Sequence, residues 1–295
     1  MDALTRPAEI ELTADLAVGD GLLEMLSGAM GALARRGSAA KNPGAEAVHR
    51  FRVGLRRLRS ILSAFGEALP ERERQALGDR LRAVAQRYGR VREWDVFLAQ
   101  SVTPLRNVLP QEEALIALER AARKARRQAL PPGDTLRSNL LTIEAAIEEA
   151  PWLRRPGPDQ AAIWDTKLRD YGAQLLRQRH RRLRRRVKTI DLADPVAFHQ
   201  LRIRVKKLRY PSELLKSLFD EDRAAKYLER LVDLQDVMGR LNDARVGSAL
   251  LDNLEVPLAA QHLATGWLAR DLASGRERFP GHARAFRRAD PFWEK

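Results

Sequence analysis

The chain is 295 residues long, and Lys plus Arg outnumber Asp plus Glu by 53 to 39. The formal net charge of +14 at pH 7 indicates an anionic partner: nucleic acid, an anionic membrane surface or a phosphate polymer. The sequence contains no Cys, which excludes disulfides, thiolate nucleophiles and cysteine-bound metal centres.

The N-terminal residues 1–16 contain several acids and no apolar stretch long enough for a signal peptide. No segment approaches the ~18 apolar residues that a membrane-spanning helix needs. We therefore expect a cytoplasmic, soluble protein without a membrane partner.

Ala, Leu, Arg and Glu are frequent and period-2 alternation is missing, which favours helix throughout the chain. A first apolar stripe predicts a helix from about residue 46 to residue 68, with Phe51, Leu55, Leu58, Leu62 and Phe65 on one face. A second predicts one long helix over 159–189, with Trp164, Leu168, Tyr171, Leu175, Leu183 and Val187 on its apolar face. A third runs from Leu201 past Pro211, where we expect a kink.

Pro- and Gly-containing breaks separate the expected helices. They lie at 37–44, 70, 110, 131–133, 151, 156–158 and 195. About ten helices result. The stretch 150–159 is the best boundary between an N-terminal half, residues 12–150, and a C-terminal half, residues 159–295. The pattern predicts an all-α fold made of helical bundles.

The sequence repeats itself at an offset of 150 residues. Segments 49–59 and 199–209 both read His-x-apolar-Arg-apolar-x-apolar-basic-basic-Leu-Arg. Without a gap, the same offset aligns Arg80-Leu81 with Arg230-Leu231, Gly89-Arg90 with Gly239-Arg240, and Glu93 with Asp243. The repeat predicts two similar halves related by approximate two-fold symmetry.

On a helix, the polar residues of each motif fall within an arc of about 80° beside the apolar stripe. The two rows are His49, Arg52, Arg56 and Arg59, and His199, Arg202, Lys206 and Arg209. Arg57 stands apart from the first row. Cations at this spacing repel one another, and no acid lies between residues 47 and 65 or between 195 and 212. An anionic ligand explains the rows better than a solvated face, which would mix both signs.

The two motifs resemble those of the CHAD domain, the conserved histidine α-helical domain. The resemblance extends to the Gly-Arg-Val-Arg-Glu-Trp-Asp run at 89–95, the run ending Leu-Asn-Asp at 234–243 and Pro-Phe-Trp at 291–293. It implies a single domain over residues 12–295, built from two four-helix bundles around a basic central cavity. CHAD domains are often fused to a CYTH (triphosphate tunnel) domain, and we expect the stand-alone form here. Glu93 stands where the family favours Asp.

The resemblance further implies that the protein binds inorganic polyphosphate and associates with polyphosphate granules. Carried over position by position, the ligand-facing candidates are His49, Arg52, Arg56, Arg57, Arg59, His199, Arg202, Lys206, Lys207 and Arg209. Arg offers forked donors to phosphate oxygens and Lys a point charge, which suits a chain of charged units without bases or sugars.

Two further basic segments, 123–127 and 177–188, either extend this track or form solvated helix faces. His180, in the second, is a weaker candidate contact, and we assign His262 and His282 to the surface or to packing. The His spacing and the surrounding cations disfavour a metal site, and no glycine-rich phosphate loop or nucleophile elbow occurs. We expect no catalytic residue, no metal and no cofactor, and therefore a protein that is not an enzyme.

Nucleic-acid binding is the main alternative. Aromatic residues are only 6% of the chain and are not interleaved with the basic rows, which disfavours stacking on single strands. A scaffold that meets an acidic protein is a third possibility. The oligomeric state is left open by the sequence.

Overall fold

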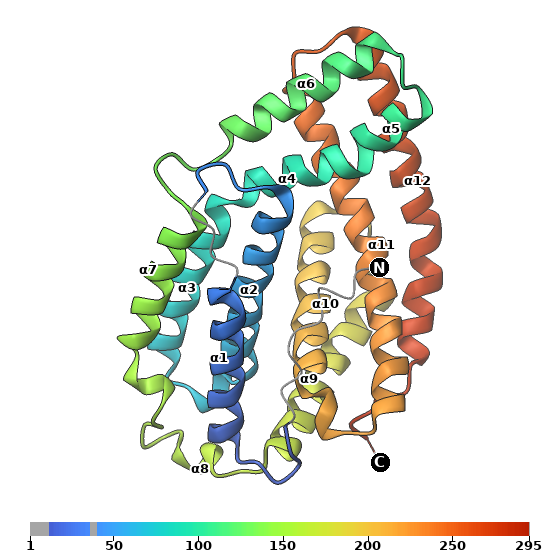
Figure 1. Ribbon diagram of the computed structural model, residues 1–295. Coiled ribbons are helices and arrows are strands. Elements are labelled where there is room, and N and C mark those ends of the chain that lie inside the picture. Colours follow the sequence, from blue (N-terminus) through green and yellow to red (C-terminus); the bar gives the residue numbers. More distant parts are fainter. Residues whose placement is uncertain (1–11, 36–39, 295) are drawn as a thin grey trace.

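The structure is a computed structural model that describes residues 12–35 and 40–294. This part of the chain is almost entirely helical, with one isolated bridge between Ala17 and Lys167 and no strand (Figure 1). The all-α prediction is confirmed. None of the described helices is both long and apolar enough to cross a membrane. The signal-peptide expectation falls largely on residues 1–11, and part of the first predicted break falls on 36–39; both lie outside the described residues.

The helices follow one another in two sets. The first set is α1 (Val18–Ala34), α2 (Ala45–Ala64), α3 (Glu71–Arg87), α4 (Gly89–Phe97), α5 (Thr103–Val108), α6 (Glu113–Gln128) and α7 (Leu136–Glu148). The second is α8 (Ala161–Trp164), α9 (Leu168–Lys188), α10 (Pro195–Leu215), α11 (Glu221–Leu251) and α12 (Leu258–Arg288). A π-helical segment, η3 (Leu98–Val102), joins α4 to α5.

Two groups of helices stand side by side in Figure 1. One contains α1, α2, α3 and α7, and the other contains α9, α10, α11 and α12. The helix α2 of the first group packs against α10 of the second, so the two His-bearing motifs come from neighbouring helices. At one end, α4, α5 and α6 cross over to α11 and α12. The two-fold relation between the halves stays a prediction.

Apolar burial joins the two groups. The larger core contains the stripes of both motif helices, including Phe51, Leu55, Leu201 and Val205. Each large apolar side chain buried in this way contributes roughly 1.5–3 kcal/mol. A smaller core, around Leu268, fixes the crossing helices on α11 and α12. The apolar faces of the two motif helices are therefore packed in the core, and their polar rows are free to face each other.

The predicted single helix over 159–189 is wrong. The chain leaves the helix after Trp164, and Lys167 is extended before α9 begins. The Val18 N–H donates to the Thr166 carbonyl at 3.0 Å, and the Leu168 N–H donates to the Leu16 carbonyl at 2.8 Å. These bonds to the N-terminal segment replace a helical turn. Sequence spacing could not show this break, because Trp164 is buried in either arrangement.

Several other helix ends agree with the predicted breaks, but the breaks at Tyr88, between α10 and α11 and between α11 and α12 were not predicted. The first motif helix, α2, ends at Ala64 and is followed by a 3-10 turn, Gly66–Ala68, within the predicted range. At the start of α10, the Asp194 carboxylate accepts the N–H groups of Val196 at 2.8 Å and Ala197 at 3.1 Å. This cap satisfies donors that a helix start leaves unpaired.

The helix α10 continues through Pro211. A proline has no N–H, so it leaves the carbonyl four residues earlier, that of Lys207, without its helical donor. Arg179 of α9 donates to this carbonyl and also to the carbonyl of Ser63 at the end of α2. One half-buried guanidinium thus links both motif helices to α9.

Candidate functional site

The polar rows of α2 and α10 meet in the structure. Arg56 Nη1 donates to the Tyr210 hydroxyl at 2.8 Å, and the Arg56 Cζ lies 5.7 Å from the Tyr210 ring centroid. The partners are 154 residues apart in the chain, so the contact joins the two halves. Tyr210 follows the second row directly, where the first motif has Ser60, and it supplies a bridge that a Ser is too short to make.

A cavity of about 350 Å³ lies next to this contact. Side chains from α2, η3, α10 and α11 line it, among them Arg56, Gln100, Arg202, Lys206, Gln235 and Asp243. Its lining also includes Arg240 and Asp236, so four cationic side chains and two carboxylates border the same space. An anionic group placed there would be surrounded by donors from both motif helices.

Crowding and burial change the ionisation of these cations. Burial, followed by the charges of Arg202 and Arg56, lowers the pKa of Lys206 to about 8. Burial, followed by the charge of Arg56, lowers the pKa of Arg52 to about 10. In both residues burial is the main cause, and neighbouring cations add to it, so an anion beside them would favour the protonated forms.

Arg202 is the clearest orphan donor in the cavity. Burial lowers its pKa, and its Nη1 atom is buried without a hydrogen-bond partner in the described part of the chain. The Oε1 atom of Gln235 in the same cavity is also buried and unpaired. Buried donors normally have partners, and leaving one unpaired costs about 1–3 kcal/mol. A ligand oxygen at this point would remove that cost.

Asp243 is a carboxylate inside a cationic site. Burial raises its pKa, while the charges of Arg202, Arg92 and Lys206 act in the opposite direction. No ion pair joins Asp243 to these cations among the described residues, and its close partner is the Asn242 amide at 3.2 Å. Asp243 therefore balances part of the positive charge from a distance and leaves the cationic groups open.

The remaining candidates of the first row lie along α2. His49 is half-buried, and burial, followed by the charge of Arg92, lowers its pKa. Arg52 donates to the Ala85 carbonyl of α3, so part of its guanidinium has a structural partner. Arg59 is also half-buried, and burial followed by the charge of Arg82 lowers its pKa. Arg57 is partly buried and lines neither of the two cavities described in this section.

Three candidates from α10 lie apart from the cavity. His199 and Lys207 are exposed. Burial of part of the Lys207 side chain, followed by the charge of Arg179, lowers the Lys207 pKa. Arg209 forms an ion pair with Glu213 at 2.7 Å, one helical turn further along. The structure therefore brings Arg56, Arg202 and Lys206 to the cavity, with Arg52 near enough for its charge to act on Lys206, and places these three apart from it.

Three residues of the site, Arg92, Asp243 and Gln100, were not among the ligand-facing candidates predicted from the sequence. Arg92 of α4 is half-buried, its charge acts on His49, Arg52 and Asp243, and burial lowers its own pKa. Arg92 and Asp243 lie in the 89–95 and 234–243 runs, which the repeat aligns with each other. That alignment is the signal that points to them. Gln100 enters through the π-helical segment, which no sequence pattern indicated.

His180 is a core residue. It is buried on α9, its Nδ1 lies 2.8 Å from the Tyr227 hydroxyl, and burial lowers its pKa. The rings of Phe286 and Trp293 pack at 5.5 and 5.7 Å from its own ring centroid. This contact explains the terminal Pro-Phe-Trp motif, which closes the bundle over α9.

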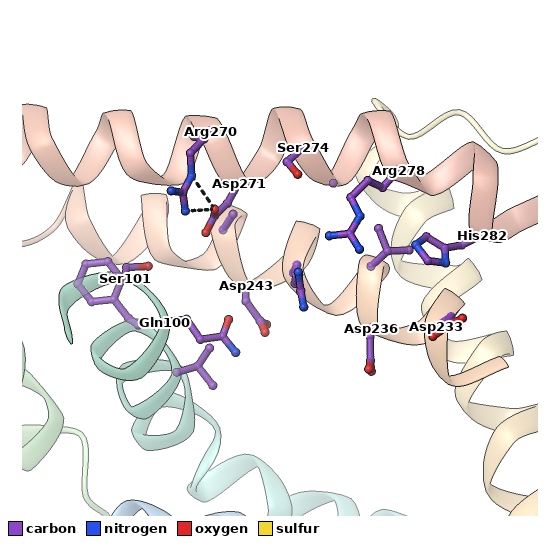
Figure 2. Close-up of a pocket in the computed structure, with 16 residues that line it drawn as sticks. Gln100, Ser101, Asp233, Asp236, Asp243, Arg270, Asp271, Ser274, Arg278 and His282 are labelled. Atoms are coloured by element: carbon purple, nitrogen blue, oxygen red, sulfur yellow. Dashed lines mark hydrogen bonds and ion pairs between the residues drawn. The ribbon is translucent and has the colours of Figure 1, made fainter. Parts of the chain in front are cut away.

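A second cavity, of about 500 Å³, lies between η3, α11 and α12. Figure 2 shows Gln100 of η3 and Asp243 of α11 close to each other, and both residues line this cavity as well as the first. His282, which the sequence assigned to the surface or to packing, also lines it. Basic and acidic side chains alternate here, and Arg270 pairs with Asp271 at 2.8 Å. Within the described residues, no cluster of His, Asp and Glu suited to a metal ion occurs.

These features define a class: an all-helical protein in which basic rows from two helical groups border a shared polar cavity. The family model described as CHAD domain matches residues 24–252. The chain belongs to the CHAD domain family, as the resemblance of its motifs indicated.

Solved structures agree with this assignment. The crystal structure of the CHAD domain from the plant Ricinus communis is similar with a TM-score of 0.72 and 26% identity, covering 97% of each chain. PptA from Streptomyces chartreusis has a TM-score of 0.66 at 18% identity, covering 91% of this chain and 99% of that one. The second similarity concerns the fold alone. None of the curated proteins matches this chain.

Proposed function

We propose that this protein binds inorganic polyphosphate through the facing rows of α2 and α10, without catalysing a reaction. The observation that carries the proposal is the group of half-buried cations around the 350 Å³ cavity, with a buried Arg202 donor that has no partner in the described residues. Membership of the CHAD family supports the same ligand class. Association with polyphosphate granules belongs to the proposal.

The ligand chemistry follows from the charges. A polyphosphate chain carries one negative charge per unit and replaces the missing counter-charge of Lys206, Arg202 and Arg52. Forked Arg donors bind two phosphate oxygens at once. Each contact displaces condensed counterions, so affinity falls steeply as salt rises. No exposed aromatic side chain of the described residues lines the 350 Å³ cavity, which offers bases no stacking surface.

Competition binding tests the proposal. Labelled polyphosphate or labelled DNA is bound to the protein, and unlabelled polyphosphate, single-stranded DNA or double-stranded DNA is added at equal phosphate concentration over a salt series. We expect polyphosphate to displace both nucleic acids, and neither nucleic acid to displace polyphosphate at physiological salt. Equal or stronger binding of DNA would contradict the proposal and favour a nucleic-acid-binding protein.

A further inference from the structure

The outer face of α9 carries a dense group of cations that the central cavity does not use. Five exposed cationic side chains lie within two helical turns: Arg181, Arg182, Arg184, Arg185 and Lys188. We call these residues the α9 basic face. They span about 10 Å along the helix. No residue of α9 lines either of the two cavities described above.

Two other arginines of α9 have partners away from this face. Arg179 donates to the carbonyls of Lys207 and Ser63, and Arg177 pairs with Glu294 at 3.5 Å. The apolar side, with Leu176, Leu183 and Val187, is buried in the core. The α9 basic face is therefore the side of the helix turned away from α10 and from the cavity.

Several exposed arginines on other helices pair with acids one turn away. Arg82 pairs with Asp79 at 3.2 Å, Arg90 with Glu93 at 3.2 Å, and Arg123 with Glu119 at 2.7 Å. Among the described residues, the α9 basic face has no such acidic partners. No acid occurs between Asp170 and Asp191, and within the described residues no ion pair or hydrogen bond involves the side chains of the α9 basic face.

An unpaired face of this kind has a cost in the isolated protein. Arg181 and Arg185, and Arg184 and Lys188, are like charges four residues apart, and such pairs destabilise a helix by about 0.2–0.5 kcal/mol each. The helix dipole offsets this only within the last turn. Exposed aromatic side chains are missing from the face, so it suits a phosphate backbone without base stacking.

We propose that the α9 basic face is a second polyanion-binding surface, which lets one protein molecule bridge two polyphosphate chains. The inference rests on the proposed function of the central cavity and adds cross-linking to it. Its occupant is a second segment of linear phosphate polymer. Because these side chains are exposed, salt screens them more strongly than the half-buried cations of the cavity. Cross-linking should therefore disappear at a lower salt concentration than binding of a single short chain.

The test separates binding from cross-linking. The α9 variant replaces Arg181, Arg184, Arg185 and Lys188 with Gln; Arg182 is retained because its charge acts on the structural Arg179. A control variant replaces four exposed arginines on other elements with Gln: Arg72, Arg137, Arg154 and Arg230. Both variants lose the same charge. Calorimetry measures the affinity for a short polyphosphate, and light scattering measures the condensation of long chains as protein is added.

We expect the α9 variant to bind the short chain within about twofold of the wild-type affinity, but to need at least about tenfold more protein to condense long chains. The control variant should condense them like the wild type.

Condensation by the α9 variant at wild-type concentrations would overturn the inference and leave the proposed function intact. A matching loss of short-chain affinity would also overturn it, because the face would then be part of one continuous site. The same light-scattering assay is run with long double-stranded DNA, and a variant that loses condensation of DNA but not of polyphosphate would assign the face to nucleic acid. A wild type that binds no short chain would defeat the proposed function itself.

Discussion

At the scale of single residues, the site is defined by cations that are more buried than their charge favours. Lys206 and Arg202 lie in a cavity whose acids, Asp243 and Asp236, only partly balance them. Burial penalises the charged form of each group, and neighbouring cations add to the penalty. An anionic ligand offsets the repulsion between neighbouring cations, so ligand binding is linked to protonation of these side chains.

Lys206 should make binding depend on pH. Its pKa is lowered to about 8 in the empty protein, and a bound phosphate chain raises it. Binding then takes up a proton above pH 8, so affinity should rise by roughly tenfold as the pH falls from about 9.5 to about 7. Polyphosphate titrations at fixed ionic strength measure this slope. The variant Lys206→Arg, which stays charged, should flatten it. An unchanged slope would show that another group titrates.

Asp243 should oppose ligand binding. Its carboxylate lies among the cations to which we assign the ligand, and Asp243→Asn removes one negative charge without changing the shape of the side chain. We expect the affinity for polyphosphate to rise roughly fivefold at low salt, on the order of 1 kcal/mol. Asp236→Asn is the matched control, because Asp236 lines the same cavity but is exposed and better screened. A weaker affinity in the Asp243 variant would mean that this carboxylate orders the site.

At the scale of helices, the sequence predicted the helices better than the connections between them. Both motif helices and the breaks at Pro70, Pro131–Pro132 and Pro195 follow from local patterns. The break after Trp164 does not, because its hydrogen bonds go to the N-terminal segment, about 150 residues away. Local patterns also do not explain how α10 continues through Pro211, because the Lys207 carbonyl that Pro211 leaves without a helical donor is bonded by Arg179 of α9.

The Arg179–Pro211 pair should behave as a coupled unit. Arg179→Ala leaves the carbonyls of Lys207 and Ser63 without this donor, which should cost about 2–3 kcal/mol of unfolding free energy. Pro211→Ala supplies a backbone N–H to the Lys207 carbonyl, so it should recover part of this loss in the Arg179→Ala background. Urea denaturation of the four proteins measures the coupling. Equal effects of Pro211→Ala in both backgrounds would show that the two residues act independently.

At the scale of the whole molecule, the sequence predicted the all-α fold and the helices that carry the site. The repeat pointed to α2 and α10, and the structure places them in contact through Arg56 and Tyr210. The repeat could not separate the residues at the cavity from those at its periphery, such as His199 and Arg209. That difference depends on how the helices are rotated and on what α4, η3 and α11 add, which only tertiary packing decides.

The central claim is that the two halves build one shared site. Its most direct test is a calorimetric titration of polyphosphate of fixed length into two paired variants. One replaces Arg52 and Arg56 on α2 with Gln, and the other replaces Arg202 and Lys206 on α10. Because Arg52 also bonds to the Ala85 carbonyl, Arg56→Gln alone serves as a second α2 variant, and circular dichroism checks the fold of each protein.

Hydrogen bonds to charged groups contribute about 1.5–3 kcal/mol each, so each paired variant should lose on the order of 100-fold in affinity. The number of chains bound to the cavity should not fall to half, since both halves hold the same chain. Retention of wild-type affinity with half the number of binding sites, in either paired variant, would contradict the shared site and show two independent ones.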